Sequence, residues 1–343
     1  MTRTQFGLRR LAVIGVATVA LSGTAAAETI VIGYQQIVGP FVAAIADGRL
    51  DAAAEKAGME IDWRQFSSGG DISTALASGN VPIGVLGSTG IASSATRGVD
   101  FQLFWILDNI GKSEALIARN GSGIETPQDL VGKKVAVPFV STSHFHLLVG
   151  LQQVWKIDPT QVNILNMKPP QIMAAWQRGD IDAAYVWPPA LSQLMADGKV
   201  ISDSEQIGAA SVPTFDGLVV DRGFAEENPE FMAAFTAELG KVYADYNANK
   251  AAWTAESQQV QGIARMIGGE GPGIVEALNM LSFPDAAGQA SPEWLGGGAT
   301  NALTQSAAFL VEQKQIDSAL PDYAPYVNAS FAEAAAKAQQ AAN

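Results

Sequence analysis

The densest group of reactive side chains in the sequence is the stretch STSHFH, which joins three hydroxyl residues to the two histidines of the chain. Ser141, Thr142 and Ser143 follow a short apolar run, and His144 and His146 come directly after them. Residues of these types can form a catalytic Ser/His pair, a metal site or the start of a helix that binds an anion. Their spacing separates the three chemistries.

The spacing argues against catalysis and against a metal ion. A hydrolase serine usually lies in a G-x-S-x-G turn, which this stretch lacks, and the partners of a triad usually come from separate elements. His144 and His146 are two residues apart, so on a helix they point in different directions, and no third ligand accompanies them. We therefore expect no catalytic residue, no metal and no cofactor.

The hydroxyl run fits a helix start better. Ser or Thr after a strand caps the next helix, and the unpaired first-turn N–H groups carry the positive end of its dipole. The stretch LGSTGIASS repeats this order in the first half of the chain, with Ser88 and Thr89 after a strand and a glycine. Capping alone explains either junction. Together, however, the two junctions would face each other across a cleft at the carboxyl ends of strands. This arrangement predicts an anion site.

Three carboxylates stand near the points where the chain is expected to cross between its two halves. Asp108 and Glu114 lie in the stretch DNIGKSE, and Asp216 lies in TFDGLVV. Taken singly, each is explained as a solvated loop residue. A carboxylate that lines the cleft beside a bound anion would instead pair with an ammonium group of the ligand.

Three further side chains are candidates for the walls of such a site. Trp187 ends a strand in AYVWPP and is either packed inside the protein or an aromatic wall of the pocket. Gln35 and Gln36 end the first strand, where their amides can donate to a ligand or face solvent.

The N-terminal residues predict export. Residues 1–10 carry three arginines and no acid, residues 11–21 are apolar or small, and the small residues AAA precede Glu28. This is the pattern of a secretory signal peptide over 1–27 that is cut before Glu28. The apolar run is too short for a membrane span, since crossing a core of ~30 Å takes about 20 residues.

Composition excludes several classes of function. The sequence has no cysteine, which rules out disulfides, thiol chemistry and a lipid anchor on cysteine. Its formal net charge is −13, whereas nucleic acids and anionic membranes are bound through basic patches. We therefore expect no nucleic-acid partner. A small anion remains compatible, because helix starts bind anions even in an acidic protein.

Strands and helices alternate in two sets, which predicts an α/β fold with parallel sheets. The predicted strands are 29–34, 59–66, 81–86, 115–118, 134–137, 162–167, 181–186 and 218–220. The helices predicted between them are 40–57, 71–78, 88–96, 126–130, 143–155, 170–178 and 189–196. Beyond them the chain is predicted mostly helical, at 229–247, 250–267, 272–281 and 299–315, with a frayed helix or tail over 331–343. Without a long linker, we expect two lobes joined by strands.

Five long segments resemble the nitrate/sulfonate/bicarbonate family of substrate-binding proteins of ABC importers, and within it the members that bind taurine. The segments are IDWRQFSSGGDISTALASGNVPIGVLGS, GKKVAVPFVSTSHFHLL, PPQIMAAWQRGDIDAAYVWPPA, DGKVISDSEQIG and NPEFMAAF. The resemblance runs from about Thr29 to Tyr326. It implies a type II periplasmic-binding-protein fold with a ligand cleft between lobe 1 (28–112 and 217–343) and lobe 2 (113–216).

The resemblance also implies the ligand and its contacts. Taurine carries a sulfonate and an ammonium group; the residues implied at the sulfonate are Ser88, Thr89, Ser141 and Thr142. Asp216 is implied as the main ammonium partner, with Glu114 as a second and Trp187 as a wall. The protein would act as a periplasmic monomer that hands taurine to an inner-membrane ABC permease.

One segment departs from the family. The chain has LDNIG where members of the family differ, so Asp108 either adds a carboxylate at the ammonium end or faces water. The residue after Gln35 also varies in the family, so the resemblance gives Gln36 no support.

Three alternatives stay open beside taurine import. The protein can bind plain alkanesulfonates, or it can serve a periplasmic sensor with the same ligand. Desulfinases of this fold use a cysteine nucleophile, which this chain lacks. We therefore expect a binding protein and not an enzyme.

Overall fold

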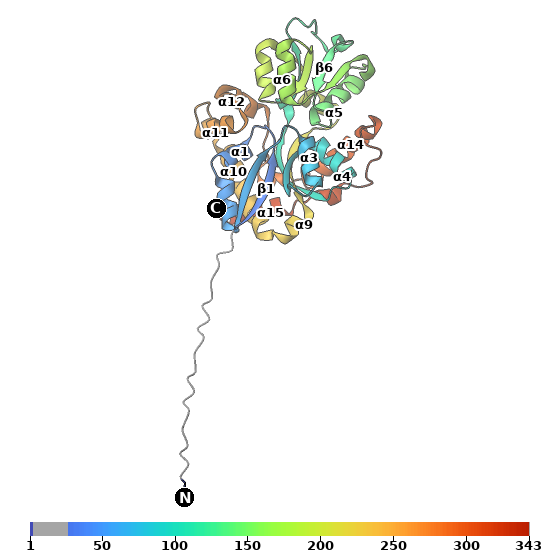
Figure 1. Cartoon of the computed structure of the whole chain (residues 1–343). Coiled ribbons are helices and arrows are strands. Elements are labelled where there is room, and N and C mark those ends of the chain that lie inside the picture. Colours follow the sequence, from blue (N-terminus) through green and yellow to red (C-terminus); the bar gives the residue numbers. More distant parts are fainter. Residues whose placement is uncertain (3–26, 343) are drawn as a thin grey trace.

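The computed structural model describes residues 1–2 and 27–342, so residues 3–26 of the predicted signal peptide lie outside the described residues. Figure 1 shows two lobes, one above the other, each built around its own sheet. Both sheets have five strands. The two-lobe α/β architecture predicted for the chain is therefore present.

Lobe 1 contains the first and last parts of the chain. Its strands stand in the order β2, β1, β3, β10, β4, with the bounds β1 (Glu28–Tyr34), β2 (Met59–Gln65), β3 (Ile83–Gly87), β4 (Phe101–Asn109) and β10 (Phe215–Asp221). Its helices are α1 (Pro40–Ala46), α2 (Arg49–Lys56), α3 (Gly69–Ala77), α4 (Ser88–Thr96), α9 (Arg222–Glu227), α10 (Pro229–Asn249), α11 (Gln258–Ile267), α12 (Gly271–Met280), α13 (Ala286–Gln289), α14 (Gly298–Glu312) and α15 (Ser330–Ala342).

Lobe 2 repeats the same strand arrangement with the middle of the chain. Its order is β7, β6, β8, β5, β9, with the bounds β5 (Ala115–Arg119), β6 (Lys134–Val137), β7 (Asn163–Asn166), β8 (Ala183–Val186) and β9 (Gly198–Asp203). Its helices are α5 (Thr142–Val149), α6 (Pro169–Arg178), α7 (Ala190–Leu194) and α8 (Ser204–Ala209).

The prediction of parallel sheets is wrong in one strand of each sheet. β10 is antiparallel to β3 and β4, and β5 is antiparallel to β8 and β9. The chain enters lobe 2 through β5 and returns to lobe 1 through β10. These two strands therefore run opposite to the strands that alternate with helices. The edge strands β4 and β9 were also missing from the prediction.

The two crossings between the lobes run side by side. The N–H of Ile110 on the first crossing donates to the carbonyl of Thr214 on the second at 3.2 Å. Asp108 and Asp216 are then register partners on β4 and β10. The predicted lobe boundary at 216/217 falls inside β10.

Several helix predictions also need correction. The stretch 40–57 forms two helices because Gly48, with φ 78°, starts a new one in a left-handed conformation. The predicted helix 250–267 is helical only in a short 3₁₀ turn and from Gln258, where Ser257 caps the first turn. Of the two predictions for 331–343, a frayed helix or a tail, the structure shows a helix, α15, which packs against α10 and buries Ala332 and Ala335.

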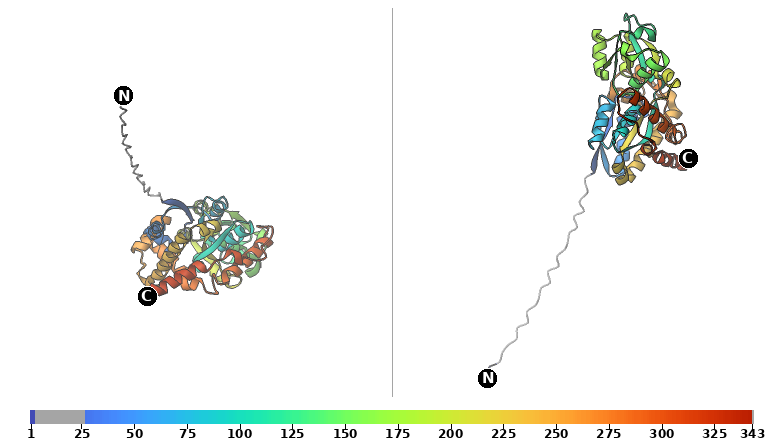
Figure 2. Two further views of the ribbon diagram at one scale, coloured as in Figure 1. Left: turned by 90° about the horizontal axis from the view of Figure 1, so that it is seen from below. Right: turned by 90° about the vertical axis from the view of Figure 1, so that its right-hand side faces the viewer.

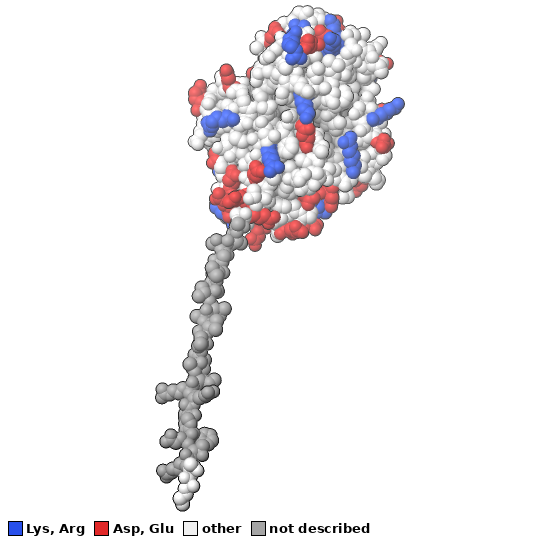
Figure 3. Space-filling view, in the orientation of Figure 1, with Lys and Arg blue, Asp and Glu red and all other residues white. Residues whose placement is uncertain are grey.

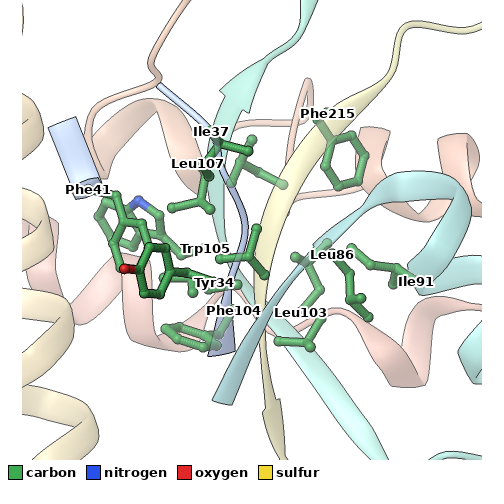
Figure 4. Close-up of a cluster of buried hydrophobic side chains, with 14 of the residues drawn as sticks. Tyr34, Ile37, Phe41, Leu86, Ile91, Leu103, Phe104, Trp105, Leu107 and Phe215 are labelled. Carbon is green, nitrogen blue, oxygen red and sulfur yellow. The ribbon is translucent and has the colours of Figure 1, made fainter. Parts of the chain in front are cut away.

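The core of lobe 1 holds large side chains on both faces of its sheet. Figure 4 shows Trp105, Leu107 and Phe41 toward one side of these strands and Leu86 and Ile91 toward the other. Apolar residues of α5, including Phe145 and Val149, join this same cluster although α5 belongs to lobe 2. The two lobes therefore share part of their core.

Two further views place the C-terminal helices and the surface charge. In Figure 2 the red C-terminal helices lie along lobe 1. On the face drawn in Figure 3, Asp and Glu gather at the end of lobe 1 remote from lobe 2. In the part of the chain that the structure describes, no helix is long and apolar enough to cross a membrane.

Candidate ligand-binding site

A small cavity lies between the lobes where three helices begin. Its volume is about 40 Å³, and we call it the outer cavity. It is lined by Gln35, Ile37, Ser68, Gly69, Gly70, Gly87, Gly90, Glu114, Pro138, Phe139, Val140, Ser141, Thr142, Trp187 and Asp216. Strand ends and helix starts of both lobes thus meet at one place, as expected for an open α/β sheet.

The two helix starts that the sequence singled out face each other. Gly87 precedes α4 in lobe 1, and a Cβ added to it would lie 3.0 Å from Thr142 Cγ2 at the start of α5 in lobe 2. The same Cβ would lie 3.3 Å from Asp216 Oδ1. Only a glycine at this position allows the lobes to approach so closely.

A third helix start lines the outer cavity, although the sequence predicted its helix, over 71–78, without a role in the site. Ser68, Gly69 and Gly70 begin α3 and line the outer cavity. Gly69 lies against Gln35, since a Cβ there would be 3.3 Å from its Nε2. The stretch SSGGD has the glycines that a close backbone approach requires, but it also reads as an ordinary turn.

The buried Oγ of Ser143, in the first turn of α5, has no hydrogen-bond partner among the described residues. The hydroxyls of Ser141 and Thr142 are engaged within the protein. Ser141 Oγ donates to the carbonyl of Pro138 at 2.6 Å and accepts from the N–H of His144 at 3.1 Å. Thr142 Oγ1 donates to Glu114 Oε1 at 2.5 Å. What α5 offers to a ligand is therefore its first-turn N–H groups rather than these hydroxyls.

The hydroxyls at the start of α4 are placed differently. Ser88 and Thr89 are buried, and their hydroxyls have no hydrogen-bond partner among the described residues. They do not line the outer cavity; the neighbouring Gly87 and Gly90 do. A buried hydroxyl without a partner is costly, so both groups are unsatisfied hydrogen-bonding groups next to the cavity wall.

A strained turn shapes the start of α5. Val140 lines the cavity with φ 62°, a left-handed conformation that a β-branched residue rarely adopts. Its N–H donates to His144 Nδ1 at 3.3 Å, and the His144 ring stacks on Phe139 with centroids 4.3 Å apart. Such strain persists where the surroundings fix the backbone, and it is concentrated at functional sites.

Both histidines are neutral structural groups. Burial lowers the pKa of His144 to about 4, which keeps Nδ1 free to accept from Val140. Burial likewise lowers the pKa of His146 to about 4, and its Nε2 lies 3.1 Å from the carbonyl of Val212. Neither histidine lines the cavity.

Behind the outer cavity lies a smaller space, the inner compartment, of about 20 Å³. It shares Ile37, Glu114, Trp187 and Asp216 with the outer cavity. Its other walls are Val38, Asp108, Ile110, Ser113, Pro188 and Leu281. The three carboxylates singled out from the sequence thus surround this one compartment.

Burial raises the pKa of all three carboxyl groups and so favours their protonated form. It raises the pKa of Glu114 to about 8, although hydrogen bonds from the hydroxyls of Thr142 and Ser204 favour its charged state. It raises the pKa of Asp216 to about 7. Burial, followed by the charge of Asp216, raises the pKa of Asp108 well above its usual value. Such a cluster calls for a cation.

Of the remaining candidates, Trp187 and Gln35 line the cavity, whereas Gln36 does not. Trp187 lines both spaces, and its Nε1 donates to the carbonyl of Gln36 at 3.2 Å, which joins the lobes. Gln35 lines the outer cavity and donates to the carbonyl of Val85. The side chain of Gln36 turns away from the cavity and donates to the carbonyl of Ile267 at 2.9 Å.

The site as a whole combines helix starts with carboxylates. Helix starts line the outer cavity, Asp108 lines the inner compartment, and Glu114 and Asp216 line both. No Lys or Arg is among the described residues that line the two spaces. No group of His, Cys, Asp and Glu in the described part of the chain could hold a metal ion. The arrangement suits a small molecule with an anion at one end and a cation at the other.

The fold and the site define a two-lobe solute-binding protein of the type II class. A solved structure, the periplasmic aliphatic sulphonate binding protein of Escherichia coli, superposes with a TM-score of 0.70 at 22% identity, covering 89% of this chain and 99% of that chain. The predicted fold class is confirmed.

The chain belongs to the NMT1/THI5 like family, whose model matches residues 34–251. The taurine-binding periplasmic protein of Escherichia coli (strain K12) is 40% identical over 312 residues, 90% of this chain and 94% of that protein. The putative aliphatic sulfonates-binding protein of the same strain is 25% identical over 268 residues, 78% of this chain and 80% of that protein. The resemblance drawn from the sequence is confirmed, and both relatives are binding proteins, not enzymes.

Proposed function

We propose that this protein captures taurine and delivers it to an ABC permease. The observation that carries the proposal is a pair of adjoining spaces that helix starts and three buried carboxylates line together. Burying a zwitterion costs several kcal/mol per charge unless each end is matched. The identity of 40% to a taurine-binding protein supports the same ligand.

The sulfonate is bound at the three helix starts. The unpaired N–H groups of α3, α4 and α5 provide donors and a positive potential without a basic side chain. The partnerless hydroxyls of Ser88 and Thr89 lie next to this end and can turn toward the ligand. Ser141 and Thr142 contribute through their backbone, because their hydroxyls are already engaged.

The ammonium group is bound by Asp216, with Glu114 beside it. Both carboxylates line the outer cavity and the inner compartment. Glu114 is held in place by hydroxyls of lobe 2, so it presents its remaining lone pairs toward Asp216 of lobe 1. Trp187 covers the ligand from the side of lobe 2.

Export places this capture in the periplasm. The arginine-rich start, apolar run and AAA site of residues 1–27 are the features of a signal peptide that is removed before Glu28. Lobe 1, which contains β1 to β4 and β10, and lobe 2, which contains β5 to β9, close over taurine, and the permease selects the closed form. No chemistry is carried out on the ligand.

The substitution Asp216→Ala tests the proposal. We expect calorimetry to show taurine binding weakened at least about 30-fold, because truncating one partner of a buried charge pair costs about 2 kcal/mol or more. Propanesulfonate, which has no ammonium, should bind as well or better. Asp62→Ala, on the half-exposed edge strand β2, is the matched control. Unchanged taurine affinity in Asp216→Ala would contradict the assignment.

The same experiment separates taurine from plain alkanesulfonates. An alkanesulfonate leaves the buried carboxylates without a cation, so we expect wild-type protein to bind taurine more tightly than propanesulfonate. The reverse order would favour an alkanesulfonate carrier. Absence of a permease gene beside this one would favour a sensor partner instead.

A further inference from the structure

Asp108 has an unused acceptor next to the proposed ammonium site. Its side chain is 2% exposed and lines the inner compartment. Its Oδ1 is buried without a hydrogen-bond partner among the described residues. An acceptor left unpaired in the interior costs free energy, so it calls for a donor that enters with the ligand.

The inner compartment has room for a small group, such as a water molecule or one end of a ligand. Its volume is about 20 Å³, and a single water needs roughly 10–15 Å³ measured in the same way. Apart from its carboxylates the walls are mostly apolar, with Val38, Ile110 and Leu281 among them. A methyl group would fit by size but would leave Asp108 unpaired.

The other two carboxylates do not satisfy a primary ammonium completely. An ammonium group has three N–H donors. Glu114 already accepts from Thr142 at Oε1 and from Ser204 at Oε2. Asp216 stands opposite Asp108 in the strand register, so their side chains can face one donor group together.

We propose that Asp108 is a specificity-determining residue, which accepts the third N–H of the ligand across the inner compartment and selects primary amines over N-methylated amines. The inference rests on the proposed taurine function. It deepens that function, because neither the helix starts nor Asp216 alone distinguishes an ammonium from its methylated forms. A methyl group directed at Asp108 removes a donor and fills the space of a water.

The test is a ligand series measured by calorimetry on the full-length mature chain. Taurine, N-methyltaurine and N,N-dimethyltaurine are compared with wild type, Asp108→Ala and Asp108→Asn. We expect wild type to bind taurine at least about tenfold more tightly than N,N-dimethyltaurine, because the dimethyl form loses a charge-assisted hydrogen bond. In Asp108→Ala that ratio should fall by about tenfold, as an acceptor is lost and space is gained.

Asp108→Asn keeps the shape of the side chain and guards against misfolding of the alanine variant. Its preference for taurine over N,N-dimethyltaurine should decrease, as in Asp108→Ala. Asp62→Ala is the control, because Asp62 lies on β2 at the opposite edge of the same sheet. Equal ratios in wild type and both Asp108 variants would overturn the inference. If wild type fails to prefer taurine over propanesulfonate, the proposed function itself fails, which is a separate outcome.

Discussion

At the scale of residues, the acid cluster is the most costly feature of the molecule. Asp108 and Asp216 are direct cross-strand partners, and like charges in that position destabilise a sheet. Glu114 adds a third buried carboxylate. The empty protein lowers the cost by holding protons, as the raised pKa values of Glu114, to about 8, and Asp216, to about 7, indicate.

Taurine binding should therefore release protons near neutral pH. In the empty site the raised pKa values keep the carboxyls of Asp216 and Glu114 partly protonated at pH 7. The ligand ammonium favours the ionised form, so binding expels protons and affinity falls as pH decreases through this range. The loss approaches about tenfold per pH unit for each proton released. Calorimetry in buffers of different ionisation enthalpy measures the number of protons.

Propanesulfonate is the control ligand for this experiment. It brings no cation to the carboxylates, so it should release no protons and bind slightly better as pH decreases. A taurine affinity that stays constant between about pH 6 and about pH 8.5, a range that spans both raised pKa values, would show that the carboxylates do not meet the ammonium.

The sequence located most single residues of the site but not their partners. All three acids and Ser141, Thr142, Trp187 and Gln35 line one of the two spaces. Which hydroxyl is free was not predictable, because Thr142 donates to Glu114, which lies 28 positions away. No spacing rule relates two such residues before the strands are assembled.

At the scale of elements, helix starts could be predicted more reliably than strand pairings. The hydroxyl and glycine patterns predicted the starts of α4 and α5 to within one residue, whereas α5 ends at Val149 and not at Trp155. The strand pattern missed β4, whose run FQLFWIL is buried on both faces and lacks alternation. It also missed the antiparallel direction of β5 and β10, because direction depends on the crossing between lobes.

The contact between α4 and α5 predicts the effect of Gly87→Ala. The added methyl group would lie 3.0 Å from Thr142 Cγ2, tighter than ordinary van der Waals contact, and the two residues belong to different lobes. Gly87 has φ −69°, so alanine strains no backbone. We expect taurine and propanesulfonate to bind about tenfold more weakly alike, since overpacking costs about 1–3 kcal/mol. Calorimetry gives both affinities.

Gly273→Ala on α12 is a matched control for this substitution. A Cβ there would meet Ser192 Cβ at 3.7 Å, an ordinary contact. Thermal unfolding of the empty Gly87→Ala protein should stay near that of wild type, because open lobes remove the clash. A large loss of thermal stability with unchanged affinity would place the effect in the fold instead of in closure.

At the scale of the whole molecule, the lobes are held together on two sides of the cleft. On one side Phe145 of α5 packs edge to face on Phe309 of α14, with ring centroids 5.1 Å apart. On the other, Lys168 Nζ before α6 pairs with Asp71 Oδ2 of α3 at 2.7 Å. The sequence predicted two lobes, but contacts between residues so distant in the chain had no local signal.

The pair Lys168–Asp71 should slow the release of ligand. Asp71 lies in the first turn of α3, beside the proposed sulfonate site, and Lys168 reaches it from lobe 2. The side chains are 45% and 37% exposed, so the pair is worth only about 0.2–1 kcal/mol. We expect Lys168→Gln to raise the dissociation rate of taurine about two- to fivefold, measured by stopped-flow tryptophan fluorescence. In about 1 M salt, where the Debye length is only about 3 Å, the wild type and Lys168→Gln should release taurine at the same rate.

A double-mutant cycle with Asp71→Asn isolates this pair. Asp71→Asn also removes a negative charge near the sulfonate, so its own effect mixes two causes with opposite signs. The coupling between the two substitutions should equal the effect of breaking the ion pair alone. Lys199→Gln breaks the exposed pair with Glu125 inside lobe 2 and should leave the dissociation rate unchanged. Additive effects of the two cleft substitutions would mean that the ion pair does not hold the lobes closed.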